Sequence, residues 1–302
     1  MRNIFVRSLS IACVATALLP TFTRAQLGIW SNESRQEFTR EWKGERFPDG
    51  RPKISDALLA RMKKVKLEIG WLVMREAGYR HQFEGGWKVI HPEERLVGRV
   101  VTAIFLPLRP DVQAVINDFG KKENRIGPQN SWMIDTLVKD DVLVVDVFGK
   151  IKDGPIAGDN LATSIFAKSG TGFVVNGAVR DVAGMAAIPG LKVYVRDFHP
   201  SAIHELTLMG INVPIRIGDV TVMPGDIVLS DPEGLTFVPP HLAEKIADAS
   251  ELAQMQDLWS HEMLRQARYT PGQIDTKWTP EMIAEFNRWA EKRGARARMK
   301  VE

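Results

Sequence analysis

The chain has 302 residues, of which 44% are hydrophobic and 25% charged, and its formal net charge is +3. This is the composition of an ordinary globular protein with a sizeable core, so no disulfide or metal is needed to hold the fold together. The one cysteine, Cys13, lies near the N-terminus, which excludes disulfides, thiolate metal sites and cysteine nucleophiles from the rest of the sequence.

Residues 1–25 have the pattern of a cleavable secretory signal. Arg2 and Arg7 give a positive start, residues 8–22 are mostly apolar, and small residues precede a cleavage position after Ala25. The alternatives are an uncleaved anchor or a misassigned start. We therefore predict a periplasmic or secreted protein with no stable membrane insertion after cleavage.

Cleavage of this segment would change the charge balance. It removes three arginines from the 40 basic residues and leaves 37, which equals the 37 acidic residues. A neutral mature chain offers no overall electrostatic attraction for nucleic acid, so we expect no nucleic-acid partner.

The next two segments differ in pattern. Residues 26–54 combine charge with aromatic side chains and have a turn at 48–50, which predicts an N-terminal aromatic-rich arm packed on the main body or on a neighbouring subunit. Residues 55–77 have apolar side chains at helical spacing, and Gly78 follows them, so we predict one helix.

Two strands are then indicated. Residues 96–106 are rich in β-branched side chains, and residues 141–148 form a near-continuous apolar run typical of a strand covered on both faces. Between them we predict a short helix at 111–119 and a charged loop at 120–129 that could border a functional cleft.

The stretch at 158–181, GDNLATSIFAKSGTGFVVNGAVRD, concentrates the chemistry. Asp159 stands before a helix-like run, a glycine-rich turn leads to an apolar strand at 173–175, and a turn at 176–177 leads to Arg180 and Asp181. Helix and strand ends bring backbone amides and side chains together, so this is a candidate site. The alternative interpretation is a structural ion pair with a helix cap.

The remaining sequence predicts a short helix at 182–188, a helical, polar C-terminal part from residue 241, and short strands between them, at 192–196, 214–217, 220–222, 227–229 and 235–238. Regular strand–helix alternation and a G-x-G-x-x-G motif are both missing, which argues against a Rossmann domain. The arm at 251–302 cannot easily form a core of its own, so we expect it to embrace a neighbouring subunit.

The spacing of Asp159, twenty residues and then Arg180-Asp181 resembles the signature of the RraA-like / 4-hydroxy-4-methyl-2-oxoglutarate (HMG) aldolase family. The sequences GDNLATS, NGAVRD and, later, PGDIVLSDPEG also resemble it, and the resemblance covers roughly residues 55–250. It implies an α/β fold, a swivelling β/β/α sandwich related to phosphohistidine domains. The N-terminal arm and the helical C-terminal arm are additions, and Asn176-Gly177 stands where the family often has Asp-Gly.

The chemistry that this resemblance implies depends on a metal. Cleavage next to an α-keto group generates an enolate, and without a Schiff base a divalent metal usually stabilises it. Magnesium prefers oxygen ligands and keeps several waters. The resemblance implies Asp181 as a direct ligand of Mg²⁺ or Mn²⁺, Asp159 as a ligand through water, and Arg180 as a donor to the substrate's keto oxygen or carboxylate.

Further site residues are expected around this group. The backbone amides of Asn160, Leu161 and Ala162, at a helix start, could hold the substrate carboxylate. The resemblance also implies sites between the subunits of a homotrimer or hexamer, with an acid from a neighbour. Glu262 is the candidate, and an ordinary surface glutamate is the equal alternative.

Together these features predict a divalent-metal-dependent class II pyruvate aldolase or decarboxylase. Its substrate would be a 4-hydroxy-2-oxo acid or oxaloacetate, and pyruvate would be released. The family also contains a ribonuclease inhibitor, so the alternative is a non-catalytic regulatory or binding protein.

Overall fold

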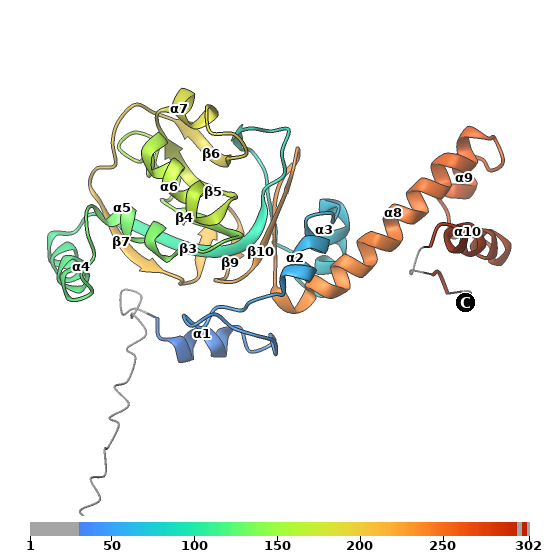
Figure 1. Ribbon diagram of the computed structural model, residues 1–302, viewed down its shortest axis with the longest axis horizontal. Helices are drawn as coiled ribbons and strands as arrows, with labels where there is room; N and C mark the ends of the chain where they lie inside the picture. Colours follow the sequence, from blue (N-terminus) through green and yellow to red (C-terminus); the bar gives the residue numbers. More distant parts are fainter. Residues whose placement is uncertain (1–29, 295–297, 301–302) are drawn as a thin grey trace, which may run out of the picture.

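Strand β4 (Asp141–Asp146) lies inside a nine-stranded mixed sheet, with helices beside it and a helical C-terminal part that extends away from it (Figure 1). The computed structural model describes residues 30–294 and 298–300, so the predicted signal segment at 1–25 lies outside the described residues. Within the described ranges, we find no helix that combines the length and the apolar character needed to cross a membrane.

The strands follow the order β1-β11-β10-β3-β4-β5-β6-β2, and β7 pairs with β3 off this path. The four consecutive strands β3, β4, β5 and β6 run parallel, and the other pairings in this sheet are antiparallel. A separate antiparallel pair joins β8 to β9. The remaining bounds are β1 Phe83–Glu84, β2 Lys88–Ile90, β3 Val97–Pro107, β5 Gly172–Val179, β6 Lys192–Phe198, β7 Leu206–Ile211, β8 Ile215–Ile217, β9 Val220–Val222, β10 Ile227–Asp231 and β11 Gly234–Val238.

The helices lie mainly at the ends and on one face of the sheet (Figure 1). Two short 3-10 helices occupy Ile134–Thr136 and Pro240–Leu242. The α-helices are α1 Asn32–Phe38, α2 Asp56–Met62, α3 Leu67–Glu76, α4 Pro110–Lys122, α5 Gln129–Trp132, α6 Asp159–Ser169, α7 Val182–Ala186, α8 Ala243–Arg265, α9 Pro271–Ile274 and α10 Pro280–Lys292.

Strand β4 shows why the sheet is covered on both faces. Leu143 and Val145 join the apolar cluster that includes Ile165 of α6, whereas Val142 and Val144 join the cluster on the opposite face, which includes the residues of β8 and β9. Alternate side chains of a strand point to opposite faces, so both faces must be apolar. The layers are therefore helices, sheet and β8–β9 pair, which confirms the predicted α/β sandwich.

The turn predicted at 176–177 is wrong, because β5 continues through it. The pairing of β5 with β6 shifts register between Val175 and Ala178, which marks a bulge rather than a chain reversal. A Cβ atom at Gly177 would lie 2.1 Å from Val147 Cγ2, so only glycine fits at this bulge. Asn176 instead donates to Asp146 Oδ1 at 2.9 Å across neighbouring strands.

The single helix predicted at 55–77 is two helices, α2 and α3. The chain breaks between them so that Val65 enters the core, and other groups satisfy the backbone that the break exposes. Arg95 Nη2 donates to the Val65 carbonyl at 2.7 Å, and Ser250 Oγ accepts from the Lys66 amide at 3.0 Å. Both partners are distant in sequence, so the local pattern could not reveal the break.

The described part of the N-terminal arm packs on the body of the same chain. Trp30 and Trp42 contact the apolar clusters, as predicted, but two buried arginines carry the polar contacts. Arg35 Nε donates to the Asp49 carbonyl at 2.7 Å. Arg51 reaches the fully buried Asp141 of β4, with Nη2 and Oδ2 3.3 Å apart.

The C-terminal arm forms a small core of its own, contrary to our expectation. Helix α8 runs unbroken through the predicted boundary between residues 250 and 251 and carries α9 and α10 away from the sheet (Figure 1). Trp259 is fully buried there, with ring centroids 4.6 Å from Trp278 and 6.0 Å from Phe286. Aromatic side chains bury large areas, so a few of them suffice for a local core.

Candidate active site at the carboxyl ends of the parallel strands

A cavity lies where β5 ends, α6 begins and α7 begins. Open sheets with parallel strands place such crevices at the carboxyl ends of the strands. Its volume is about 90 Å³. The residues that line it include Asn130, Pro155, Ile156, Ala157, Gly158, Asp159, Asn160, Leu161, Arg180, Asp181, Ala202 and Ile203.

Asp181 stands between β5 and the first residue of α7. Its backbone has φ 56° and ψ 43°, the left-handed region that asparagine and aspartate tolerate better than most residues. Its side chain is half exposed, and Oδ2 lies 3.5 Å from Arg180 Nε. The carboxylate therefore remains accessible from the cavity while a guanidinium partly balances its charge.

Arg180 is held by its backbone more than by its side chain. Its amide donates to the Ala157 carbonyl at 3.1 Å, which joins the end of β5 to the loop before α6. The guanidinium is partly exposed at the cavity. A planar guanidinium in this position can donate two parallel hydrogen bonds to a carboxylate.

Asp159 is the first residue of α6, and its Oδ1 accepts from the Asn160 amide at 2.8 Å. A negative charge at a helix N-terminus is favourable, because the free amides there carry partial positive charge. Asp159 and Asp181 therefore reach one cavity from the starts of two helices.

Two glycines allow these acids to pack closely. A Cβ atom on Gly158 would lie 2.3 Å from Asp181 Oδ2, and one on Gly184 would lie 2.5 Å from Asp159 Oδ2. Distances this short are not tolerated between real side-chain atoms, so each acid occupies the space that a larger residue would fill.

Of the three amides predicted to hold a carboxylate, one is engaged within the helix. The Ala162 amide donates to the Gly158 carbonyl at 3.0 Å, and the Ala162 side chain is fully buried. The prediction that this amide holds the substrate carboxylate is therefore wrong. The Asn160 amide binds Asp159, and Leu161 lines the cavity with it. The first amides of a helix lack partners inside the helix, so the Leu161 amide remains a candidate donor.

Sequence reasoning missed Asn130. Its side chain is buried at the start of α5, and Nδ2 donates to the Ile156 carbonyl at 2.7 Å, which fixes the cavity wall. The loop that we expected to border a cleft ends one residue earlier, at 129. The signal in the sequence was an amide side chain soon after a Gly-Pro turn. Its hydrogen-bond partner lies 26 residues away, so the contact could not be predicted.

Glu262 lies in the C-terminal arm, far from α6 and α7 in this chain (Figure 1). Its Oε2 accepts from Trp289 Nε1 at 2.9 Å and from Arg293 Nη2 at 3.1 Å. These contacts give Glu262 a structural role within the arm. Its predicted role in a neighbouring subunit's site stays a prediction.

The residues present fit a hard divalent ion only in part. Among residues 30–294 and 298–300, no group of three or more His, Cys, Asp or Glu side chains is arranged to hold a metal. Asp181 and Asp159 supply carboxylate oxygens, and Mg²⁺ commonly uses one or two carboxylates while water or substrate completes its shell. Asp159 and Asp181 are thus the residues at this cavity that would supply carboxylate oxygens to such an ion.

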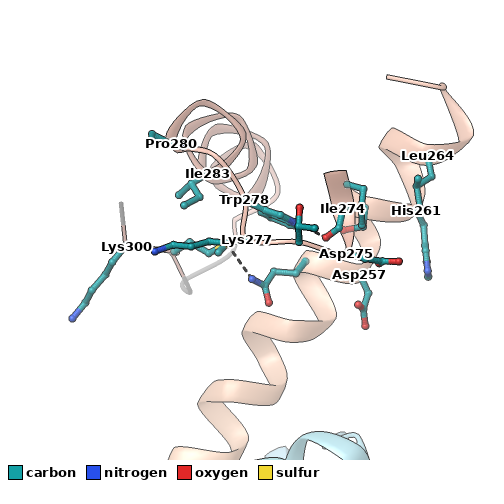
Figure 2. Close-up of a pocket in the computed structure, with 14 residues that line it drawn as sticks. Asp257, His261, Leu264, Ile274, Asp275, Lys277, Trp278, Pro280, Ile283 and Lys300 are labelled. Atoms are coloured by element: carbon teal, nitrogen blue, oxygen red, sulfur yellow. Dashed lines mark hydrogen bonds between the residues drawn. The ribbon is translucent and has the colours of Figure 1, made fainter. Parts of the chain in front are cut away.

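A second cavity, of about 610 Å³, lies in the C-terminal arm (Figure 2). Lys277 and Lys300 lie on one side of it, whereas Asp257 and His261 lie on the other and do not converge with them (Figure 2). Asp257 is also paired with Lys66 of the body. We therefore place the candidate active site at the strand ends.

Fold and site together define an α/β protein with two carboxylates and a guanidinium at the ends of its parallel strands. A family model described as RraA-like, Aldolase/RraA, matches residues 51–237, more than half of the sequence. The chain belongs to this family.

Curated relatives carry the HMG aldolase name provisionally. A protein of Halalkalibacterium halodurans so named is 32% identical over 117 residues, which cover 39% of this chain and 55% of that protein. One from Shewanella oneidensis is 37% identical over 96 residues, or 32% of this chain and 57% of that protein. The chain thus spans little more than half the length of these relatives.

Solved structures share the fold. A Pseudomonas syringae protein aligns with a TM-score of 0.60 and 19% identity, over 76% of this chain and 98% of the other. Streptomyces coelicolor RraAS2, described as an unusual member of the RNase ES inhibitor RraA family, aligns with a TM-score of 0.56 and 24% identity, over 72% and 100%.

Proposed function

We propose that the protein is a divalent-metal-dependent carbon–carbon lyase that releases pyruvate from a 4-hydroxy-2-oxo acid or from oxaloacetate. The observation that supports this most is the convergence of Asp159, Arg180 and Asp181 on one cavity. Lyase chemistry of this kind would use all three groups, the acids to hold a metal and the guanidinium to bind the substrate.

Each residue has a role in this proposal. Asp181 would hold Mg²⁺ or Mn²⁺ directly, and Asp159 would bind it through water. Such an ion supplies Lewis-acid polarisation of the substrate's keto oxygen. Arg180 and the amide of Leu161 would bind the substrate carboxylate and keep its keto group oriented toward Asp181.

Cleavage of the hydroxy acid removes the proton of its 4-hydroxyl group and breaks the bond between carbons 3 and 4, so that carbon 4 leaves as a carbonyl compound. Oxaloacetate instead loses carbon 4 as CO2. In both cases the electron pair of the broken bond stays on carbon 3. Arg180 lines the cavity, so its guanidinium would stabilise the negative charge that then develops on the keto oxygen. A water held by Asp159 would accept the hydroxyl proton and later return a proton to carbon 3, which completes pyruvate.

We also propose that the site is completed by a neighbouring subunit of a trimer or hexamer. A further cavity of about 340 Å³ shares Asn130 and Ile203 with the candidate active site. Leu108, which lines it, exposes 39% of its surface, and Leu106, Val115 and Ile126, each close in sequence to a lining residue, expose 43%, 51% and 84%. Exposed apolar groups around a site support contact with another copy of the chain.

The predicted export signal supports a periplasmic or secreted location, where this enzyme would act on small 2-oxo acids. The neutral charge of the mature chain gives no support for a nucleic-acid partner. Mass spectrometry of the protein from its native host would test the export proposal, since cleavage predicts a chain beginning at Gln26.

The test of function is pyruvate release by the mature protein from oxaloacetate and HMG, with Mg²⁺ or Mn²⁺ and with EDTA. We expect release that EDTA abolishes. Asp181→Asn should abolish turnover and weaken Mn²⁺ binding measured by electron paramagnetic resonance. Asp135→Asn, an exposed acid remote from the cavity, is the matched control and should change neither.

Two results would contradict the proposal. Unchanged pyruvate release by Asp181→Asn would remove this carboxylate from the reaction. A folded wild-type protein that binds Mn²⁺ but releases no pyruvate from either substrate would favour the non-catalytic binding role.

A further inference from the structure

A separate cavity of about 220 Å³ lies between the N-terminal arm and the body. Phe38 and Trp42 of the arm line one side of it, and Tyr79, Asp226 and His241 of the body line the other. It shares no lining residue with the candidate active site, so a ligand here would not compete directly for that site.

Aromatic rings make up much of its wall. Trp42 is fixed by its Nε1 donating to the Glu45 carbonyl at 2.7 Å. The Tyr79 hydroxyl lies 3.2 Å from His241 Nε2, and the two ring centroids are 5.9 Å apart. Phe38 adds a further ring to the lining; it is 68% exposed and packs against Trp30, with ring centroids 4.9 Å apart. The negative face of an aromatic ring attracts a cation within about 6 Å.

Two carboxyl groups line the cavity, and they have no lysine or arginine partner there. Glu41 and Asp226 line it, and none of its lining residues is lysine or arginine. The Asp226 carboxyl is buried, and its Oδ2 accepts only from the Met223 amide at 2.8 Å among the described residues. Buried carboxyls normally have a cationic partner, so this one lacks its usual compensation.

The pKa values of the lining groups are consistent with the absence of a lysine or arginine partner. Burial raises the pKa of Asp226 to about 8, only partly offset by the Met223 amide. Burial also lowers the pKa of His241, although Glu41 opposes this, so the imidazole supplies little positive charge near neutral pH. Asp226 is therefore mainly protonated near neutral pH while the cavity is empty, and a bound cation would favour its ionised form.

We propose that this cavity binds a small organic ammonium ion. Such a ligand would place its positive charge between Glu41 and Asp226 and its alkyl groups against the rings of Trp42 and Tyr79. A carboxylate beside several aromatic rings is the arrangement that recognises quaternary ammonium groups. A metal ion is a poorer fit, because the rings offer it no ligand atoms.

The test uses choline and its uncharged isostere 3,3-dimethylbutan-1-ol, with binding to the full mature chain measured by isothermal titration calorimetry. The two probes have nearly the same shape, so charge alone distinguishes them. We expect choline to bind at least about tenfold more tightly, since cation–π attraction and one charge pair together exceed about 1.4 kcal/mol. Equal affinity of the two probes, or no choline binding, would overturn the proposal.

Substitutions of lining residues test whether the ligand binds in this cavity. Glu41 is exposed, so Glu41→Gln should leave the fold intact and weaken choline binding several-fold, whereas Glu37→Gln, on the same arm but outside the cavity, should not. Trp42→Leu should weaken binding about tenfold, and Trp71→Leu, at an exposed tryptophan elsewhere, is its control. Choline binding that survives both cavity variants would show that another surface binds it.

Discussion

Gly158 is the residue whose substitution tests the candidate active site most selectively. Its φ of −107° is accessible to any residue, so the backbone does not require glycine there. The limit is space, because a Cβ atom would lie 2.3 Å from Asp181 Oδ2. A methyl group at this position therefore acts on the position of the carboxylate.

We expect Gly158→Ala to fold normally and to lower kcat/KM roughly 100-fold, since small displacements of reacting groups carry losses of this size. The measurement is steady-state pyruvate release, with circular dichroism as the check of folding. Gly272→Ala is the matched control, because nothing lies within 4 Å of a Cβ there. Full activity of Gly158→Ala would mean that the position of Asp181 is not critical.

At the residue scale, the sequence predicted the three charged side chains that meet at the cavity. The family pattern identified Asp159, Arg180 and Asp181, although local spacing alone left a structural ion pair equally open. The family pattern could not reveal that the Ala162 amide donates to a carbonyl within α6, because this hydrogen bond depends on where the helix begins. Asn130 was missed since its partner, Ile156, is close only in the folded chain.

At the scale of elements, the buried pair of Arg51 and Asp141 joins the N-terminal arm to the sheet. Arg51 also binds Asp49 Oδ2 at 2.8 Å, and both Arg51 and Asp141 are almost fully buried. Burial disfavours the charged guanidinium, but Asp141 and Asp49 outweigh this and raise the pKa of Arg51. Arg51 is thus charged whenever the arm is docked.

Arg51→Met should lower the free energy of unfolding by about 3–5 kcal/mol, because it removes the guanidinium that pairs with the buried Asp141 carboxyl and leaves it Arg99 Nε at 4.0 Å. Urea denaturation followed by tryptophan fluorescence measures this change. The double variant Arg51→Met with Asp141→Leu removes both charges and should recover much of the loss. If the double variant instead loses as much stability as the two single variants added together, the charge pair does not account for the loss.

Element prediction succeeded where the local pattern decides structure. The apolar run of β4 predicted its strand, and Asp159 with Gly170 framed α6, whose C-cap glycine has φ 69°. It failed at the break between α2 and α3 and at the bulge in β5, where distant partners determine the backbone. Strand β7 was missed altogether, and its pairing with β3 is itself interrupted by a bulge.

At the scale of the molecule, the C-terminal arm should behave as a semi-independent unit. Its apolar cluster around Trp259 is separate from the three clusters of the body. The beginning of α8 instead packs on α2 and α3 through Ile246 and Ala247. One helix therefore belongs to two cores, one at each end.

Trp259→Ala should destabilise the arm by about 3–5 kcal/mol and leave the body folded. Hydrogen exchange should show lost protection in α9 and α10 but unchanged protection in β4 and β5. A chain ending at residue 258 gives the comparison, and its body should unfold at the same temperature as that of Trp259→Ala. Loss of protection throughout the sheet would show that arm and body fold as one unit.

The sequence was sufficient for the central sandwich, because the family pattern covers most of it. It was insufficient for the arm, whose aromatic residues 259, 278 and 286 are spread over three segments. Periodicity within a helix shows that one face is apolar, but not which other face covers it. We therefore expected a neighbouring subunit where the chain covers itself.

The left-handed backbone at Asp181 has a consequence for how this protein can be improved. Glycine adopts that conformation without strain, whereas an aspartate there loses about 1 kcal/mol of folding free energy. A selection for thermal stability alone would therefore favour Asp181→Gly, and would discard the carboxylate on which the proposed chemistry depends. Engineering for heat resistance and engineering for turnover pull in opposite directions at this single position.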